Sequence, residues 1–282
     1  MKLRRLASCC ALAALAAACS SGSGSTAASS SAATTTTAPA PRFSAGDGYV
    51  SVGSSLASGF GIKNQSTPCG RSDRDYGQLV AAHYGMTVND VSCGGAVVPN
   101  VVDTPQNDNP PQIDAVTADT KLITVGLGGN DIGYNGTALG CGDPATVCTA
   151  PPNLDADAAA LPGKLEAMIA ALKAKAPSAV IVLVTYPREF PPTNCPALSM
   201  TDAELAVLQN MGTIIEDALV ATAGKTGVLL ADPYAQPGDH TACAPASEQW
   251  TAGYTVTDGF AYHPTALGHQ EMATLIAAAL GG

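Results

Sequence analysis

Four short motifs in this sequence carry groups that together could cleave an ester. Ser55 lies in Gly-Ser-Ser-Leu directly after an apolar run, Gly95 in Cys-Gly-Gly-Ala after a second run, and Asn130 in Gly-Gly-Asn-Asp after a third. His263 lies in a loop close to the end of the chain. Ester hydrolysis needs a nucleophile, a base that removes its proton, and donors aimed at the oxyanion that forms. These four residues can fill all three roles.

In this hypothesis Ser55 is the nucleophile and His263 is its general base. The oxyanion hole consists of the main-chain N–H groups of Ser55 and Gly95 and the side-chain amide of Asn130. Loss of one such donor typically costs about 3 kcal/mol of transition-state stabilisation. His263 then protonates the departing alkoxide and activates the water that releases the acid.

Each of these residues alone also has an ordinary structural interpretation. A serine beside glycine is commonly a turn residue, and a glycine such as Gly95 often allows a tight turn. Asn130 could be a turn former or helix cap, and His263 a loop residue. We favour the catalytic interpretation because all four occur together. For Asp131, which follows Asn130, we expect a capping or turn-forming role.

The elements that would position these motifs alternate between strands and helices. Five apolar or β-branched runs have the length of strands: residues 49–52, 86–91, 122–125, 179–185 and 228–231. Leucines at helical spacing precede Pro177, and a capping box at Thr201 and Glu204 begins a second long helix. Thr265 can cap a last helix over residues 266–280.

This alternation predicts an α/β fold, because parallel strands need long crossover connections that helices provide. We expect a three-layer α/β/α sandwich around a central, mainly parallel five-stranded sheet. Such sheets bind ligands beyond the carboxyl ends of their strands. The motifs of Ser55, Gly95 and Asn130 all lie at that edge.

The order of the motifs resembles the SGNH (GDSL-like) hydrolase family from Tyr49 to Leu280, and in particular its secreted bacterial three-disulfide lipases and esterases. Ser55 falls on the block I serine and Gly95 on the block II glycine. Asn130 falls on the asparagine of G-x-N-D, and His263 on the histidine of H-P-x-x-x-G. The resemblance implies the flavodoxin-like arrangement of this family, the catalytic roles given above, and a reaction that needs neither a cofactor nor a metal.

Two positions depart from the family pattern. Ser54 stands where block I usually has aspartate, and Phe260 stands where the family usually has an aspartate three residues before the histidine. The group that orients His263 is therefore open. Asp258 could reach back and complete a triad, or a main-chain carbonyl at or near Phe260 could leave a dyad. We favour the dyad, because a loop carboxylate next to glycine is often only a turn former.

The cysteines indicate an oxidising compartment. Three of the nine lie in the first nineteen residues, and the even number that remains fits disulfides, which form outside the reducing cytosol. No spacing typical of a zinc site is present. Six cysteines allow fifteen pairings, and the resemblance to the secreted lipases implies three bridges between sequence neighbours: Cys69–Cys93, Cys141–Cys148 and Cys195–Cys243.

The first part of the chain has the composition of an export leader. Residues 1–19 combine basic residues, a short apolar run and a small-residue stretch that ends at Cys19, as in a signal peptide of the lipoprotein type. The lipobox resemblance is imperfect, since Leu15 lies one position too early, so simple cleavage is the alternative. Residues 20–42, rich in Ser, Thr and Ala, have the composition of a flexible tether, and residues 43–282 form the hydrolase domain. We expect an exported protein, extracellular or attached to the cell envelope through acylated Cys19.

The charge of the chain argues against nucleic acid as a partner. The formal charge is −10, and removal of a leader that holds three basic and no acidic residues makes it −13. A net negative surface without a basic stripe repels phosphates. We expect a monomer that hydrolyses carboxylic esters, with acyl lipids as substrates. Polysaccharide or small-molecule acetylesterase activity is one alternative, and a catalytically inert surface-binding protein with the same fold is the other.

Overall fold

The computed structural model describes residues 42–282 apart from residue 67, and its centre is a parallel sheet. The sheet has five strands in the order β4-β1-β5-β6-β7, and all neighbouring pairs run parallel. This confirms the expected sheet. The strands are β1 (Gly48–Gly53), β4 (Thr87–Asp90), β5 (Leu122–Gly126), β6 (Val180–Val184) and β7 (Leu229–Ala231). A separate antiparallel pair consists of β2 (Gln65–Ser66) and β3 (Arg71–Ser72).

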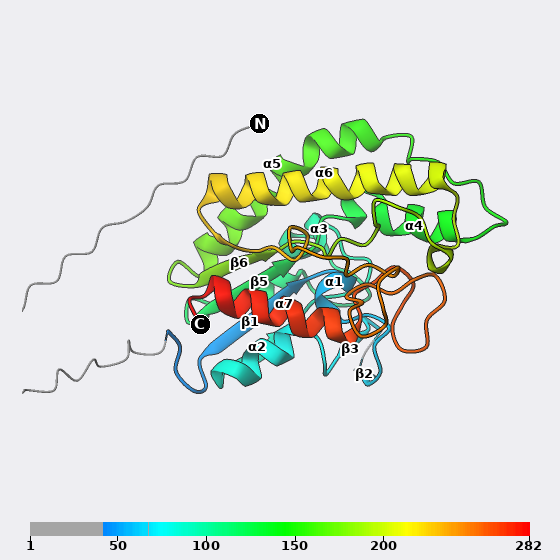
Figure 1. Ribbon diagram of the computed structural model, residues 1–282. Coiled ribbons are helices and arrows are strands. Elements are labelled where there is room, and N and C mark those ends of the chain that lie inside the picture. The colour runs from blue at the N-terminus through cyan, green and yellow to red at the C-terminus, as the bar shows by residue number, and fades with distance from the viewer. Residues whose placement is uncertain (1–41, 67) are drawn as a thin grey trace, which may run out of the picture. The chain divides into compact units, whose positions relative to one another are not determined.

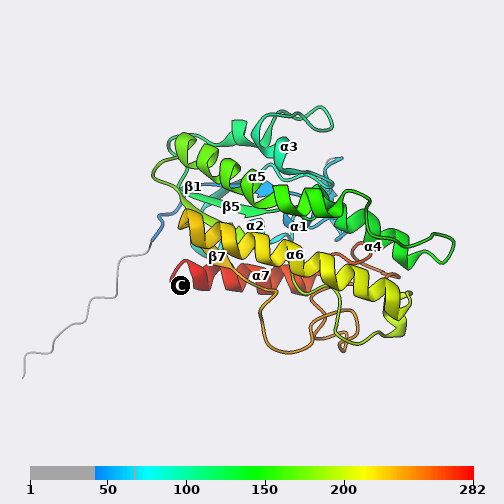
Figure 2. The same cartoon turned by 90° about the horizontal axis from the view of Figure 1, so that it is seen from above.

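Helices cover both faces of the sheet, as the predicted three-layer sandwich requires. Figure 1 shows two long helices on one side of the strands, α5 (Leu154–Lys175) and α6 (Asp202–Thr226). On the other side lie α2 (Tyr76–Tyr84) and α7 (Ala266–Ala279). The view from above shows α5 and α6 lying over the strands (Figure 2). The shorter elements, which lie in the connections, are α1 (Ser55–Ser58), α3 (Val98–Val102), α4 (Tyr134–Gly142), η1 (Gln112–Ala115), η2 (Asn130–Ile132) and η3 (Pro196–Leu198).

The predicted helix starts agree with the structure. Thr201 and Glu204 form the reciprocal capping box at the start of α6, where each main-chain N–H donates to the other side chain. Thr265 caps α7, since its Oγ1 accepts the Gly268 N–H at 3.0 Å. These bonds satisfy donors that a helix start otherwise leaves unpaired.

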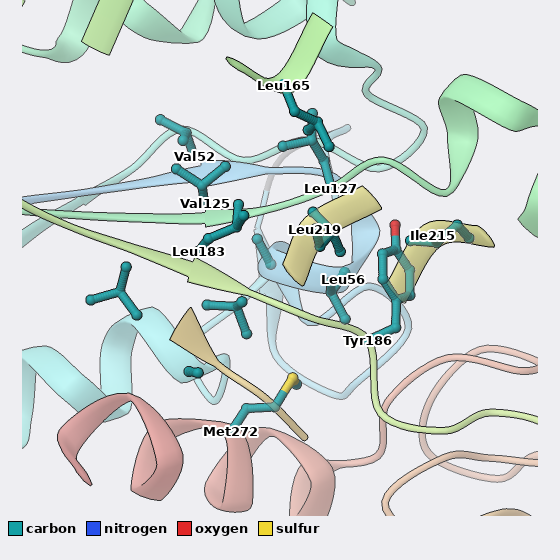
Figure 3. Close-up of a cluster of buried hydrophobic side chains, with 14 of the residues drawn as sticks. Val52, Leu56, Val125, Leu127, Leu165, Leu183, Tyr186, Ile215, Leu219 and Met272 are labelled. Carbon is teal, nitrogen blue, oxygen red and sulfur yellow. The ribbon is translucent and has the colours of Figure 1, made fainter. Parts of the chain in front are cut away.

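The core lies on both faces of the central strands. Figure 3 shows Val52, Val125 and Leu183 on adjacent strands, with Leu165 from the α5 side and Met272 from α7. All five side chains are fully buried. Burying one such side chain contributes about 1.5–3 kcal/mol, so the strands are held firmly up to their carboxyl ends. The loops that carry the motifs begin there.

The six cysteines of the described region form the three expected disulfides, Cys69–Cys93, Cys141–Cys148 and Cys195–Cys243. A native disulfide typically contributes about 2–4 kcal/mol. The predicted leader, the tether up to residue 41 and the lipidation site Cys19 lie outside the described residues. Among the helices of residues 42–282, residue 67 excepted, none has the length and apolar character needed to cross a membrane.

Candidate active site

Ser55 lies at the turn between β1 and α1, where the sequence analysis expected it. It is the first residue of α1, and it is 4% exposed. Gly53 ends β1 with φ +150°, and a Cβ there would collide with the Gly126 carbonyl oxygen, so the turn requires glycine. Ser54, which stands where the family usually has aspartate, caps α1: its Oγ accepts the Leu56 N–H at 3.4 Å and its N–H donates to Gly126 O at 2.9 Å.

A buried glutamine fixes the end of β1 beneath Ser55. The Gly53 N–H donates to Gln112 Oε1 at 2.7 Å, and Gln112 Nε2 donates back to the Gly53 carbonyl at 2.9 Å. The Gly53 carbonyl also accepts the Cys93 N–H at 3.0 Å. These bonds link the Ser55 turn to the disulfide beside the Gly95 loop.

His263 contacts Ser55 directly. The distance between His263 Nε2 and Ser55 Oγ is 2.9 Å, and Nδ1 lies 2.8 Å from the Ala261 carbonyl oxygen. A carbonyl can only accept, so Nδ1 carries the proton and Nε2 accepts the Ser55 hydroxyl. Burial lowers the pKa of His263, and the Ala261 carbonyl opposes this only in part. The imidazole is therefore neutral and has the tautomer that a general base needs.

The loop before His263 is a tight turn that delivers this carbonyl. Tyr262 has φ +56°, a left-handed conformation that costs free energy for a residue with a Cβ. The Phe260 carbonyl accepts the main-chain N–H of His263 at 3.1 Å, whereas the ring nitrogen Nδ1 binds the Ala261 carbonyl. Tyr262 is anchored by a hydrogen bond from its hydroxyl to the Leu198 carbonyl. The carbonyl beside the ring belongs to Ala261, the neighbour of Phe260.

Asp258, the other candidate for orienting His263, binds different partners. Its Oδ1 accepts the Lys63 N–H at 2.7 Å, and its Oδ2 lies 3.2 Å from Arg74 Nη2. The hydrogen bond from Lys63 lowers the pKa of Asp258, and Arg74 lowers it further. Within the described residues, no hydrogen bond joins Asp258 to His263. The carboxylate instead fastens the His263 loop to the chain around Lys63.

The Gly95 loop and Asn130 lie next to Ser55. Gly95 has φ +80°, and Gln106 Nε2 donates to the Gly94 carbonyl at 2.9 Å, which fixes the peptide bearing the Gly95 N–H. Asn130 Nδ2 donates to the Ala96 carbonyl at 3.0 Å. Among residues 42–282, apart from residue 67, the N–H groups of Ser55 and Gly95 have no protein acceptor. They remain available as oxyanion donors.

One cavity of about 410 Å³ joins all four predicted residues. Ser55, Gly95, Asn130 and His263 lie in its wall, and its remaining side chains are Phe60, Pro68, Asn135, Leu139 and Phe260. His263 is the single titratable side chain in this lining. The wall therefore suits an uncharged, largely apolar group beside Ser55.

The fold described above agrees with what comparisons to known proteins show. A model described as the GDSL-like Lipase/Acylhydrolase family matches residues 51–271. The chain belongs to this family.

Similar proteins include lipases and an esterase. A lipase from Streptomyces rimosus is 28% identical over 239 residues, covering 82% of this chain and 85% of that protein. Lipase 1 of Streptomyces coelicolor is 29% identical over 242 residues, with coverage of 82% and 85%. The crystal structure of phospholipase A1 from Streptomyces albidoflavus NA297 is similar with a TM-score of 0.68 and 25% identity, covering 83% of this chain and 99% of that one. The extracellular lipase of Streptomyces rimosus gives a TM-score of 0.68 at 26% identity, with coverage of 82% and 99%.

Three further residues of this GDSL-like site were not found from the sequence. Asn135 Nδ2 lies 3.5 Å from Ser55 Oγ, and Gln106 and Gln112 bind the peptides next to Gly95 and Ser55. Gln106 lies in a loop and Gln112 begins η1, and no spacing pattern marks either residue. Asn135 follows Asn130 by five residues, and only the start of a helix there could have suggested that it points back toward the site.

Asp131 and a second polar residue, the buried His269, have structural roles. Asp131 accepts the Val98 N–H at the start of α3, at 3.1 Å from both carboxylate oxygens, which is the expected capping role. His269 is fully buried, and its Nδ1 accepts the Tyr76 N–H at 3.1 Å. Burial lowers the pKa of His269 to about 3. Within the part of the chain that the structure describes, no group of three or more His, Cys, Asp or Glu side chains could hold a metal ion.

Proposed function

We propose that this protein is an exported serine esterase or lipase that cleaves carboxylic esters with a Ser55–His263 dyad. The observation that carries the proposal is the direct contact of 2.9 Å between His263 Nε2 and Ser55 Oγ, with Nδ1–H held by the Ala261 carbonyl. A neutral, correctly oriented base next to a hydroxyl is the arrangement that activates a serine nucleophile.

In acylation, Ser55 Oγ attacks the ester carbonyl carbon while its proton moves to His263 Nε2. The negative oxygen of the tetrahedral intermediate accepts hydrogen bonds from the Ser55 and Gly95 N–H groups and the Asn130 amide. Collapse expels the alcohol, which takes the proton from Nε2. Water then gives a proton to Nε2 and attacks the acyl-enzyme, and the second intermediate releases the acid.

The Ala261 carbonyl does part of the work of a triad aspartate. It holds the tautomer and orientation of His263, but it has no formal charge with which to stabilise the imidazolium formed in the transition state. Burial further disfavours that cation and lowers the pKa of His263. This dyad is therefore a weaker base than a histidine paired with a carboxylate, but it stays deprotonated at lower pH.

Acyl lipids are the substrates that the cavity wall favours. Phe60, Leu139 and Phe260 line it, and no acidic or basic group other than His263 faces an acyl chain there. The relatives include proteins named lipase, esterase and phospholipase A1. The test is hydrolysis of p-nitrophenyl esters from acetate to palmitate by wild type and Ser55→Ala. Activity that increases from acetate to longer chains supports a lipase or esterase, whereas a maximum at acetate would indicate an acetylesterase.

A catalytically inert protein with this fold is the remaining alternative, and active-site labelling tests it. An organophosphonate should modify Ser55 of the wild type, as shown by mass spectrometry of the labelled peptide. Absence of both label and hydrolysis would overturn the proposed function.

Export and envelope attachment are part of the proposal. Three disulfides and the likeness to an extracellular Streptomyces lipase support export. We expect acylated Cys19 to hold the protein at the membrane and Cys19→Ala to release it into the medium. Soluble wild-type protein whose first residue lies beyond Cys19 would contradict the attachment.

A further inference from the structure

Asn135 is a polar side chain at the nucleophile to which the family motifs assign no role. It is the second residue of α4, and this helix start is fixed by Gly133 with φ +75° and by the Tyr134 N–H, which donates to the Gly129 carbonyl at 2.9 Å. Tyr134 itself is buried. The fold therefore holds Asn135 firmly against the cavity that contains Ser55.

The amide of Asn135 faces two acceptors. Its Nδ2 lies 3.5 Å from Ser55 Oγ and 3.3 Å from Asn130 Oδ1. An amide nitrogen carries two hydrogens, one for each acceptor. The reverse orientation would put the Asn135 oxygen against the Asn130 oxygen, so the hydrogen-bond network itself selects this one.

With these contacts, the donor and acceptor of each hydrogen bond around Ser55 are fixed. His263 Nδ1–H donates to the Ala261 carbonyl, so Nε2 must accept the Ser55 hydroxyl. The Ser55 oxygen then has lone pairs for the Asn135 N–H. Because Asn130 Oδ1 accepts from Asn135, the Asn130 amino group must face the other way. One of its hydrogens binds the Ala96 carbonyl, and the second is available to an oxyanion.

We propose that Asn135 is a catalytic residue that stabilises negative charge on Ser55 Oγ. The inference rests on the proposed function. In acylation the Oγ–H bond breaks, its proton goes to His263 Nε2, and an electron pair of Oγ forms the bond to the carbonyl carbon. In deacylation the C–Oγ bond breaks, its electron pair returns to Oγ, and Nε2 returns the proton. Oγ gains negative charge in both steps, and the Asn135 N–H stabilises it without transferring its own proton.

Asn135 also positions Asn130. If its amide is removed, Asn130 Oδ1 loses its donor, and the Asn130 amide can rotate away from the oxyanion. Both effects act on transition states more than on the bound ester. They predict a fall in kcat with little change in KM.

The experiment compares Asn135→Ala and Asn135→Asp with a matched control, Thr137→Val. Thr137 lies on the same helix, and its hydroxyl donates to the Gly133 carbonyl at 2.9 Å. Loss of one oxyanion donor costs about 10²–10³ in kcat, and a donor to the attacking oxygen should cost about 10- to 100-fold. Asn135→Ala should show this loss with KM within about threefold of wild type. Asn135→Asp, which keeps the shape but replaces the donor by a carboxylate, should lose more.

A second readout is the rate at which an organophosphonate labels Ser55, since this depends on the nucleophile and needs no acyl chain. Labelling should slow about as much as kcat falls in both Asn135 variants and stay at the wild-type rate in Thr137→Val. An Asn135 variant that is folded, by its melting curve, and retains wild-type kcat and labelling overturns the inference while leaving the proposed function intact. A wild type that neither hydrolyses esters nor takes the label overturns the proposed function instead.

Discussion

Asp258→Asn distinguishes a dyad from a triad. The Asp258 carboxylate bonds to the Lys63 N–H and Arg74, while the Nδ1–H of His263 belongs to the Ala261 carbonyl. Asparagine keeps an acceptor for Lys63 and loses only the ion pair with Arg74. The two side chains of that pair are 39% and 28% exposed, and such pairs contribute about 0–1 kcal/mol. The variant should melt at most a few degrees below wild type.

The same geometry sets the expected effect on catalysis. With the dyad, kcat/KM should fall less than about tenfold, which corresponds to about 1.4 kcal/mol of transition-state stabilisation. In a serine protease triad, the equivalent replacement of aspartate by asparagine lowers kcat about 10⁴-fold, because the tautomer is lost. The assay is kcat/KM for one p-nitrophenyl ester, measured with the melting temperature of each variant.

Asp114→Asn is the matched control, since Asp114 forms an ion pair of 3.4 Å with Lys175 and is half exposed. It should leave kcat/KM unchanged. A loss above a hundredfold in Asp258→Asn, at an unchanged melting temperature, would refute the dyad and show that the carboxylate reaches His263 during the reaction.

Three more predictions follow from the site and the core. Ser55→Ala should abolish ester hydrolysis and Ser54→Ala should keep appreciable activity, because the Ser54 hydroxyl caps α1 and donates to the Gly126 carbonyl but does not contact His263. The reverse result in the p-nitrophenyl assay would mean that the nucleophile is misassigned. Because burial lowers the pKa of His263, the acid limb of the kcat/KM profile should have its midpoint below pH 6.5, and a midpoint above that value would contradict the neutral, buried base. Burial raises the pKa of Glu189 from 4.5 to about 8. Between these two pH values the carboxyl group ionises in the unfolded chain but stays protonated in the folded protein, which favours unfolding. The free energy of unfolding of wild type should therefore fall relative to that of Glu189→Gln by up to about 1.4 kcal/mol per pH unit in this range. Urea unfolding of both proteins at pH 4, 6 and 8 measures this difference, and parallel stability profiles would refute it.

The sheet and the positions of the motifs at its edge could be predicted, because the sequence patterns that produce strands and helix starts are local. β-branched runs, the capping box at Thr201 and the cap at Thr265 each act within a few residues of sequence, and the structure contains all of them. The contacts of the candidate site are different. Ser55 and His263 are 208 residues apart, and their contact depends on how the final loop returns to the first strand.

The acceptor for His263 could not be chosen from the sequence, because it is a main-chain carbonyl and every residue has one. Its position depends on the left-handed backbone conformation of Tyr262, and a tyrosine in the sequence gives no indication of such a conformation. Gln106 and Gln112 each bind a glycine peptide outside their own segment: Gln106 binds the Gly94 carbonyl and Gln112 the Gly53 peptide, which is 59 residues away. The placement of side chains within a motif was predictable, whereas support from other segments was not.

Phe260, which stands where the family usually has aspartate, makes the surroundings of His263 aromatic and uncharged. Phe260 meets the His263 ring edge to face at 5.1 Å and the Phe60 ring at 5.1 Å, so aromatic packing holds the imidazole from the side of the cavity. The Ala261 carbonyl holds it at Nδ1. A carboxylate at position 260 would add a charge next to a cavity whose wall is otherwise neutral and largely apolar. With phenylalanine there, the proposed base His263 has no counter-charge, but the position beside Ser55 is left apolar for the proposed acyl group. The orienting task then falls to the main chain, which explains why the turn at Tyr262 is held in a strained conformation.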